Sequence, residues 1–205
     1  MMPAPRLHEH DVTLRGERTV LRPLRESDWD VLARWNQDPE VLYFSEGDDV
    51  SAYTLAEVQA IYRYVSQTAL IFMIELDGAP IGECWLQAMN LPRLLRRHPG
   101  LDLRRIDLTI GEKPLWGRGF GTEAIRLLVA YAFEHERADA VFGCDIGDYN
   151  PRSRRAFEKA GFSLYAARRQ RPGGKARVRY DYVRCREGVA LHRLREPRRR
   201  GMRTR

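Results

Sequence analysis

The feature that most constrains this chain is a run of alternating glycines directly before an apolar helix pattern. Gly117, Gly119 and Gly121 leave several backbone N–H groups with little side chain to cover them. Apolar residues at helical spacing follow and predict a helix over residues 122–135 with one buried face. Exposed amides at a helix N-terminus attract anions, because the N–H groups point outward and the helix dipole favours negative charge. The pattern predicts a phosphate or pyrophosphate site at this loop.

Other glycine-rich loops differ from this one in what surrounds the glycines. No Gly-Lys-Ser/Thr follows them, so the lysine and the metal-binding hydroxyl of a P-loop are missing. Residues 119–124 fit the G-x-G-x-x-A fingerprint of dinucleotide-binding domains, but the strand expected at residues 104–111 ends well upstream. The chain after the fingerprint is also too short for the second half of such a sheet. A glycine turn that binds no ligand is the remaining alternative.

The hydrophobic pattern along the chain predicts an α+β fold. Asp77-Gly78 between two apolar runs is a strong hairpin signal, and Pro172-Gly173-Gly174 predicts a second hairpin. Residues 41–44 form a short apolar and aromatic segment, and residues 89–103 an irregular insert. We expect a mixed, largely antiparallel sheet of about seven strands with about four helices. Strands are predicted at residues 19–24, 69–76, 79–87, 104–111, 140–146, 163–170 and 177–185, and helices at residues 27–35, 54–67, 122–135 and 153–160.

The formal charge of +7 is concentrated near the C-terminus. Residues 186–205 hold eight arginines against two glutamates, so the rest of the chain is close to neutral. A nucleic-acid footprint would gather on a folded face, so we expect a solvated tail and no nucleic-acid partner. No long apolar run and no apolar signal region is present, so we expect neither a membrane span nor secretion. Cys84, Cys144 and Cys185 lack metal-ligand spacing, so we expect no metal site and a reducing, cytoplasmic location.

A second motif lies downstream of the glycine loop. Residues 148–151 read Asp-Tyr-Asn-Pro, and residues 157–162 read Phe-Glu-Lys-Ala-Gly-Phe. Together with the strand, the turn and the [x]-G-[KR]-G-x-[GA] loop, this order resembles the GNAT acetyltransferases, which bind the pyrophosphate of coenzyme A at the loop. The resemblance covers Thr19 to Cys185. We therefore expect one acetyltransferase domain over residues 1–185, with disorder in residues 1–10 and in the tail 186–205.

The resemblance implies acetyl-CoA as the co-substrate and residues that hold it. The strand end near Ile110 resembles the edge that holds the pantetheine arm and donates an N–H to the acetyl carbonyl. Asn150 is a candidate hydrogen-bond partner of this arm, with an Asn-Pro turn as the alternative. Phe157 is expected to contact the coenzyme, but it stands where related enzymes often have a proton-donating tyrosine, so we assign no general acid. The loop residues expected to contact the coenzyme are Trp116, Gly117, Arg118, Gly119, Phe120, Gly121 and Thr122, of which Trp116 departs from the Arg or Gln common at its position.

Two aspartates are candidates for chemistry on a cationic amine. On the predicted strand, Asp107 shares a face with Arg105 and Thr109, while apolar residues occupy the other face. The segment around it resembles aminoglycoside 6′-N-acetyltransferases, which implies that Asp107 contacts the amine and acts as the base. A solvent-facing strand residue is the alternative, although aspartate is poorly suited to strands. Asp145, at the end of the next strand, is implied to bind the cationic substrate, with a loop carboxylate as the alternative.

Aromatic and acidic residues upstream suggest where the acceptor binds. Tyr43 and Phe44 could stack on a sugar ring, or could belong to the core. Glu46, Asp48 and Asp49 would add negative charge at the mouth of the cleft. Arginines in the insert would repel a polycation unless they turn away. These arginines are Arg93, Arg96, Arg97, Arg104 and Arg105.

One leading hypothesis and two alternatives follow. We expect an acetyl-CoA-dependent N-acetyltransferase that acts by direct transfer in a ternary complex on an aminoglycoside-like small-molecule amine. The aromatic segment and Asp107 favour this acceptor, whereas the arginines favour a protein N-terminus or a small metabolite. A different class is a non-catalytic coenzyme-binding module that the basic tail tethers to nucleic acid. We expect a monomer or a homodimer.

Overall fold

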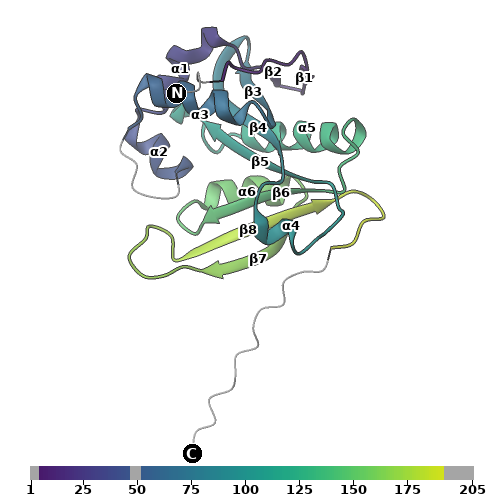
Figure 1. Cartoon of the computed structure of the whole chain (residues 1–205). Coiled ribbons are helices and arrows are strands. Elements are labelled where there is room, and N and C mark those ends of the chain that lie inside the picture. Colours follow the sequence, from purple (N-terminus) through teal and green to yellow (C-terminus); the bar gives the residue numbers. More distant parts are fainter. Residues whose placement is uncertain (1–4, 47–51, 192–205) are drawn as a thin grey trace, which may run out of the picture.

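The computed structural model describes residues 5–46 and 52–191, which are built around one sheet (Figure 1). In these residues the sheet has eight strands in the order β1-β2-β3-β4-β5-β6-β8-β7. Neighbouring strands are antiparallel except β5 and β6, which run parallel. The expected mixed, mostly antiparallel sheet is thus confirmed, and the short β1 is the strand that the sequence did not predict. The strands are β1 (Leu14–Arg15), β2 (Thr19–Pro23), β3 (Ala69–Leu76), β4 (Ala79–Ala88), β5 (Leu103–Ile110), β6 (Ala140–Gly147), β7 (Ser163–Arg169) and β8 (Val178–Cys185).

Helices connect the strands and begin at recognisable caps. Thr54 and Glu57 form a reciprocal capping box at the start of α3, because each side chain accepts a hydrogen bond from the other's backbone N–H. Residues 41–44, expected to be a short apolar segment, are helical because the Asp38 side chain caps α2 and Pro39 occupies its first turn. The α-helices are α1 (Trp29–Trp35), α2 (Pro39–Ser45), α3 (Leu55–Val65), α4 (Pro92–Leu95), α5 (Phe120–Glu134) and α6 (Pro151–Lys159), with short 3-10 helices η1 (Glu26–Asp28) and η2 (Lys113–Leu115).

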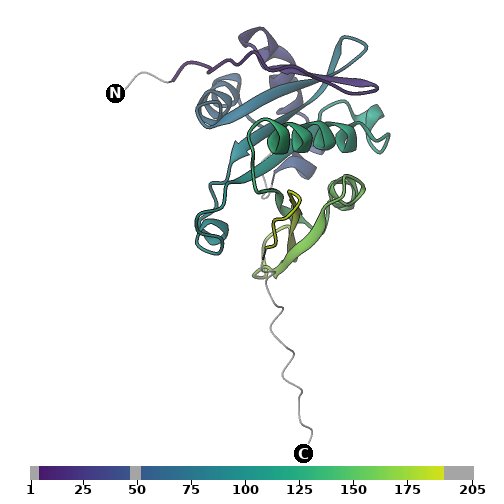
Figure 2. The same cartoon turned by 90° about the vertical axis from the view of Figure 1, so that its right-hand side faces the viewer.

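The helices cover both faces of the sheet. Figure 2 shows α5 and α6 on one face and α3 and α4 on the other. Phe72 and Ile74 of β3 join the core under α5 and α6, whereas Ile71 and Met73 join the core under α1 and α3. Since side chains alternate along a strand, one apolar strand thus supplies two separate cores.

Strands β5 and β6 pair over only part of their length. Their register ends at Ile106 opposite Gly143. Beyond this point β6 is irregular, and Asp145 adopts a φ of 57° in the left-handed region. The edge of β5 at residues 107–110 that faces away from β4 therefore has no paired strand. Because backbone N–H and C=O groups need partners, this edge is open to a ligand.

The ends of the described chain contact the body of the protein. In the N-terminal segment for which we expected disorder, His8 N donates to Ser66 Oγ at 2.9 Å. In the tail, Arg186 forms an ion pair with Asp139 at 2.7 Å. Residues 192–205, which carry most of the basic tail, lie outside the described residues.

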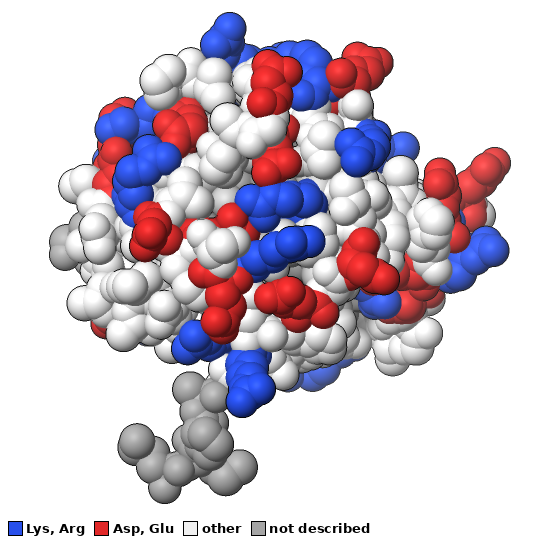
Figure 3. Space-filling model, turned by 90° about the horizontal axis from the view of Figure 1, so that it is seen from above, with Lys and Arg blue, Asp and Glu red and all other residues white. Residues whose placement is uncertain are grey.

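Acidic and basic side chains occur together on the visible surface (Figure 3). Figure 3 shows acidic and basic side chains interspersed over the upper face of the molecule. In the part of the chain that the structure describes, no helix has the length and apolar character needed to cross a membrane.

Candidate active site

The glycine loop leads directly into α5. Gly117 and Gly119 have φ values of 75° and 94°, a left-handed conformation that favours glycine. Gly119 is the N-cap and provides no side-chain cap, and the helix's first backbone hydrogen bond runs from Glu123 N to Gly119 O. The N–H groups of residues 120–122 are therefore left without helical partners and can bind an anion.

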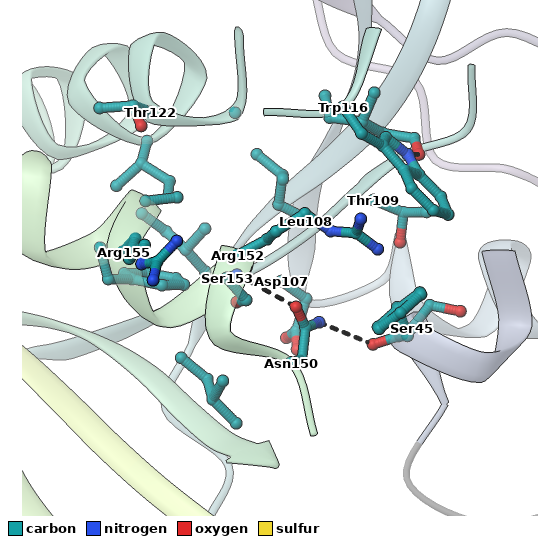
Figure 4. A pocket seen from close by; sticks show the side chains of 18 of the residues that line it. Ser45, Asp107, Leu108, Thr109, Trp116, Thr122, Asn150, Arg152, Ser153 and Arg155 are labelled. Carbon is teal, nitrogen blue, oxygen red and sulfur yellow. Dashed lines mark hydrogen bonds between the residues drawn. The ribbon is translucent and has the colours of Figure 1, made fainter. Parts of the chain in front are cut away.

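A cavity of about 460 Å³ opens beside this loop. It lies where β5 and β6 diverge and is walled by the first turns of α5 and α6 (Figure 4). Its volume falls within the range of roughly 300–1,000 Å³ typical of small-molecule sites. We call it the glycine-loop cavity. The residues expected to bind coenzyme that line it are Ile110, Trp116, Gly117, Gly119, Phe120, Gly121, Thr122, Asn150 and Phe157.

Several basic residues line the glycine-loop cavity, but Arg118 is not among them. The Arg118 side chain is exposed, and its carbonyl accepts a hydrogen bond from Arg18 Nη1 at 3.2 Å. Guanidinium and ammonium groups bind phosphate oxygens through charge-assisted hydrogen bonds, so basic lining residues favour a phosphorylated ligand. Those near α6 and β8 are Arg152, Arg155, Lys159 and Arg179.

Trp116 and Arg152 connect the loop to neighbouring elements. The Trp116 indole donates to Ile110 O at 2.6 Å, which fixes the end of β5 against the loop. The Arg152 guanidinium lies 4.2 Å from the ring centre of Phe44 and 4.3 Å from that of Trp116. These cation–π contacts bring α2, α6 and the loop together at the cavity.

Asn150 lines the cavity, but the protein itself uses its side chain. Asn150 Oδ1 accepts from Ser153 N at 3.1 Å and caps α6, while Nδ2 donates to Phe44 O at 3.0 Å (Figure 4). The residue therefore joins the end of α2 to the start of α6.

A second, smaller cavity of about 270 Å³ adjoins the first. Of the described residues, three that bear a carboxyl group line it, and these are Glu46, Glu83 and Asp107. Asp48 and Asp49, which we expected to add further acidity, lie outside the described residues. We call this space the acidic cavity. Its aromatic walls are Trp35, Tyr53, Tyr62 and Trp85.

Asp107 lines both cavities and so marks the place where they meet. Its carboxylate pairs with Arg105, whose Nη2 lies 2.8 Å from Oδ1 and 2.7 Å from Oδ2. The predicted faces of β5 are confirmed, because Leu108 and Ile110 pack in the core beneath α5 while Asp107 faces the acidic cavity. A carboxylate at this junction is placed to contact both an acceptor and a coenzyme-bound group.

Glu83 is an acidic residue of the cavity that the sequence reasoning missed. Its residue is only 6% exposed, and among the described residues its Oε2 has no hydrogen-bond partner. Burial, and then the negative charge of Asp107, raise the pKa of Glu83 to about 8, against contacts with Thr109 and Trp85 that lower it. The signal that could have found it is a charged residue in the apolar run of β4.

Glu46 completes the acidic wall at the end of α2. Burial raises the pKa of its carboxyl, and the charge of Asp107 adds to this, while the Tyr53 hydrogen bond and the Lys175 charge oppose it. A cation that enters this cavity would therefore meet several acidic groups at once.

Asp145 lines the glycine-loop cavity, but its carboxylate is occupied by protein cations. Arg93 lies 2.9 Å from Oδ2, and Arg168 pairs with Oδ1. The same two arginines pair with Asp181, which is fully buried. Although burial raises the pKa of Asp145, Arg168 and Arg93 outweigh this effect and hold the pKa below its ordinary value. The cluster ties the insert to β6, β7 and β8.

Other arginines near β5 are also neutralised. Arg104 pairs with Glu136 at 2.6 Å and with Asp102, and Arg105 pairs with Asp107. Together with the pairing of Arg93, this removes most of the repulsion that we expected the insert to exert on a cationic acceptor.

Tyr43 and Phe44 occupy different positions. Phe44 lines the glycine-loop cavity, whereas Tyr43 lines neither cavity and is 48% exposed. Lys175 Nζ lies 4.0 Å from the Tyr43 ring centre and 4.2 Å from that of Tyr149, and it donates to the carbonyls of Tyr43 and Glu46. The β7–β8 hairpin is thus attached to the end of α2.

Phe157 cannot donate a proton to a leaving group, because its side chain has no ionisable group. Its ring is buried and packs against Gly143, where an added Cβ would come within 2.5 Å of it. Among the described residues, the tyrosine that lines the glycine-loop cavity is Tyr149, and its hydroxyl donates to Glu46 O at 2.9 Å.

Known proteins share this fold and sequence pattern. An acetyltransferase (GNAT) domain profile matches residues 18–163. The aminoglycoside N(6′)-acetyltransferase type 1 of Klebsiella pneumoniae is 26% identical over 156 residues, covering 74% of this chain and 77% of the relative. The crystal structure of AAC(6′)-Ib in complex with coenzyme A has a TM-score of 0.67 and 25% identity, covering 82% of this chain and 95% of that chain. A GNAT-family acetyltransferase from Bacillus anthracis has a TM-score of 0.69 and 17% identity, covering 85% of this chain and 98% of that chain.

The profile spans most of the chain, including β5, the glycine loop and α6. The related sequences and the shared fold identify the protein as an enzyme that transfers acetyl groups to amines. The chain therefore belongs to the GNAT acetyltransferase family.

Proposed function

We propose that this N-acetyltransferase uses acetyl-CoA and transfers the acetyl group directly, in a ternary complex, to a cationic small-molecule amine of the aminoglycoside type. The observation that carries the proposal is the position of Asp107 between the glycine-loop cavity and the acidic cavity. One cavity suits a phosphorylated donor and the other suits a cationic acceptor. The shared carboxylate lies where the two reactants would meet.

The donor is assigned to the glycine-loop cavity. Its pyrophosphate would be held by the N–H groups of residues 120–122, aided by the basic residues that line this cavity. The pantetheine arm would lie along the open edge of β5 at residues 107–110, where backbone groups lack a paired strand. A β5 N–H directed at the thioester carbonyl would stabilise the negative charge that develops on its oxygen.

The reaction needs a deprotonated amine and a protonated leaving group. The amine nitrogen attacks the thioester carbonyl carbon, a C–N bond forms, and the C–S bond breaks. Asp107 accepts the proton that the amine loses, directly or through one water molecule. Because Phe157 and the engaged Tyr149 supply no proton, the coenzyme A thiolate takes its proton from solvent.

The acceptor is assigned to the acidic cavity. Glu46 and Asp107 attract a cationic amine, and the aromatic walls can pack against a sugar ring. The volume of about 270 Å³ suits one ring rather than a whole drug-sized molecule. A cytoplasmic location fits the buried thiol of Cys84. Either a monomer or a homodimer is compatible with both cavities lying in one chain.

Thiol release from acetyl-CoA tests this proposal. Purified protein is assayed with kanamycin, with a peptide that has a free N-terminus, and without an acceptor. We expect amine-dependent thiol release with kanamycin and an acetylated product by mass spectrometry. Turnover confined to the peptide would favour the N-terminal acetyltransferase alternative, and no turnover with bound acetyl-CoA would refute the amine acceptor.

A further inference from the structure

Glu83 is a buried carboxyl that lines a cavity and has one oxygen without a partner among the described residues. Only 6% of the residue is exposed, and its Oε2 has no hydrogen-bond partner among the described residues. A buried polar atom without a partner carries a desolvation cost, so native proteins rarely retain one without another role. Since Glu83 lines the acidic cavity, a ligand there can supply the missing donor.

The strand register places Glu83 beside Asp107. Glu83 of β4 is directly opposite Thr109 of β5, and Asp107 is two residues from Thr109 on the same face. Diagonal neighbours of this kind lie about 7–8 Å apart, within reach of one small ligand. The cavity therefore presents two carboxyl groups to a single molecule.

Charged and titratable groups from several elements face Glu83. Burial raises its pKa most, and the negative charges of Asp107 in β5 and of Glu46 at the end of α2 add to this. Tyr62 of α3 also lines the cavity. Near neutral pH these surroundings therefore keep Glu83 protonated. A second ammonium group of a ligand would pair with the Glu83 carboxylate and so lower the pKa of Glu83.

We propose that Glu83 is a second acceptor-binding group, which acts with Asp107 to select amines that carry a further ammonium group close to the nitrogen that is acetylated. The inference rests on the proposed function and adds a selection rule for its acceptor. A monoamine would occupy Asp107 and leave Glu83 unpaired. A diamine would satisfy both carboxyl groups, with release of the proton that Glu83 holds.

The test compares 1,4-diaminobutane with n-butylamine as acceptors in the thiol-release assay. We expect the wild-type protein to prefer the diamine in kcat/KM by about 10-fold or more, since a charge-assisted hydrogen bond is worth a tenfold change in binding or more. This preference is expected to grow between pH 6.5 and 8.5 as Glu83 ionises. In Glu83→Gln the preference shrinks to less than about 3-fold and loses its pH dependence.

Two further variants separate binding from structure. Glu83→Asp keeps the carboxyl and is expected to retain part of the diamine preference. Glu40→Gln makes the same charge change at an exposed residue that lines neither cavity, and is expected to keep the full preference. Equal use of both amines by the wild-type protein, or an unchanged preference in Glu83→Gln, overturns the inference alone. Acetylation of kanamycin but of neither alkylamine overturns the inference alone. Acetylation of none of the three, with acetyl-CoA still bound, overturns both the inference and the amine acceptor of the proposed function.

Discussion

Arg105 and Asp107 form an ion pair along one face of β5, with Arg105 Nη2 2.8 Å from Oδ1 and 2.7 Å from Oδ2 of the aspartate. The pair sits where the glycine-loop cavity meets the acidic cavity. Arg105 donates a hydrogen bond to Oδ1, which restricts how the carboxylate can rotate, while Oδ2 has no hydrogen-bond partner among the described residues. The proposed base is therefore oriented before substrates bind.

Replacing Asp107 tests its role as the base. We expect Asp107→Asn to lower kcat/KM for the amine by about 100-fold or more, the usual contribution of a general base. Binding of acetyl-CoA, measured by calorimetry, should stay within about 2-fold, because the loop and α5 are unchanged. Asp30→Asn, at an exposed position of α1 that lines neither cavity, is the matched control. A kcat/KM in Asp107→Asn equal to that of the control would exclude Asp107 as the base.

The buried acid Glu83 makes stability depend on pH in a defined direction. Its pKa is about 8 in the folded protein and has an ordinary value of 4.5 when unfolded. Between these values the folded state binds the proton and the unfolded state does not, so stability falls as pH rises. At pH 8 Glu83→Gln should therefore have a free energy of unfolding a few kcal/mol above that of the wild type, on the order expected for a pKa shift of this size. At pH 4.5 the two free energies of unfolding should be nearly equal. Urea unfolding at both pH values measures this, and equal stability at pH 8 would contradict the burial argument.

Much of the site is predictable because its signals are local. The glycine loop, the helix after it and the alternating faces of β5 each depend on residues close in sequence, and the structure confirms all of these. Helix α2 was missed because residues 41–44 alone give no helical period, and the capping by Asp38 has to be combined with Pro39 to reveal it.

Contacts between distant segments could not be predicted in the same way. Asp145 reads as an open carboxylate in sequence, yet Arg93 and Arg168 reach it from segments 52 and 23 residues away. The significance of Glu83 likewise arises only when β4 pairs with β5 and brings Asp107 beside it. Such pairings of charged side chains depend on the tertiary fold, and the hydrophobic periodicity of a short segment does not predict them.

Lys175 is expected to support the acceptor side of the site. Its ammonium group contacts the rings of Tyr43 and Tyr149 and the carbonyl of Glu46. Lys175→Met should loosen the end of α2 and raise the acceptor KM by about 3- to 10-fold, the range of a cation–π contact, with kcat little changed. Acetyl-CoA affinity should not change. Steady-state kinetics with kanamycin checks this, and an unchanged KM would show that the contact does not shape the acidic cavity.

Asp145 is expected to act on stability rather than on acceptor binding. Asp145→Asn removes the charge that Arg93 and Arg168 share, and should lower the free energy of unfolding by about 1–3 kcal/mol at pH 7. Since the folded pKa of Asp145 is lowered, this stabilisation exists above the unfolded pKa and is lost as pH falls through the folded value. The acceptor KM should stay within about 3-fold. A larger rise in KM with unchanged stability would restore Asp145 as an acceptor ligand.

The most direct test of the account is calorimetric titration of acetyl-CoA into three proteins: the wild type, Gly119→Ala and Gly78→Ala. Both glycines have left-handed φ values, 94° and 79°, so an alanine costs each a similar backbone strain of about 1–2 kcal/mol. Gly119 caps α5 at the glycine-loop cavity, whereas Gly78 lies in the distant β3–β4 turn and lines neither cavity. We predict saturable binding to the wild type and to Gly78→Ala, and an affinity at least about 10-fold weaker in Gly119→Ala. No heat of binding to the folded wild type, or equal affinity in all three proteins, would contradict the claim that these amides hold the coenzyme.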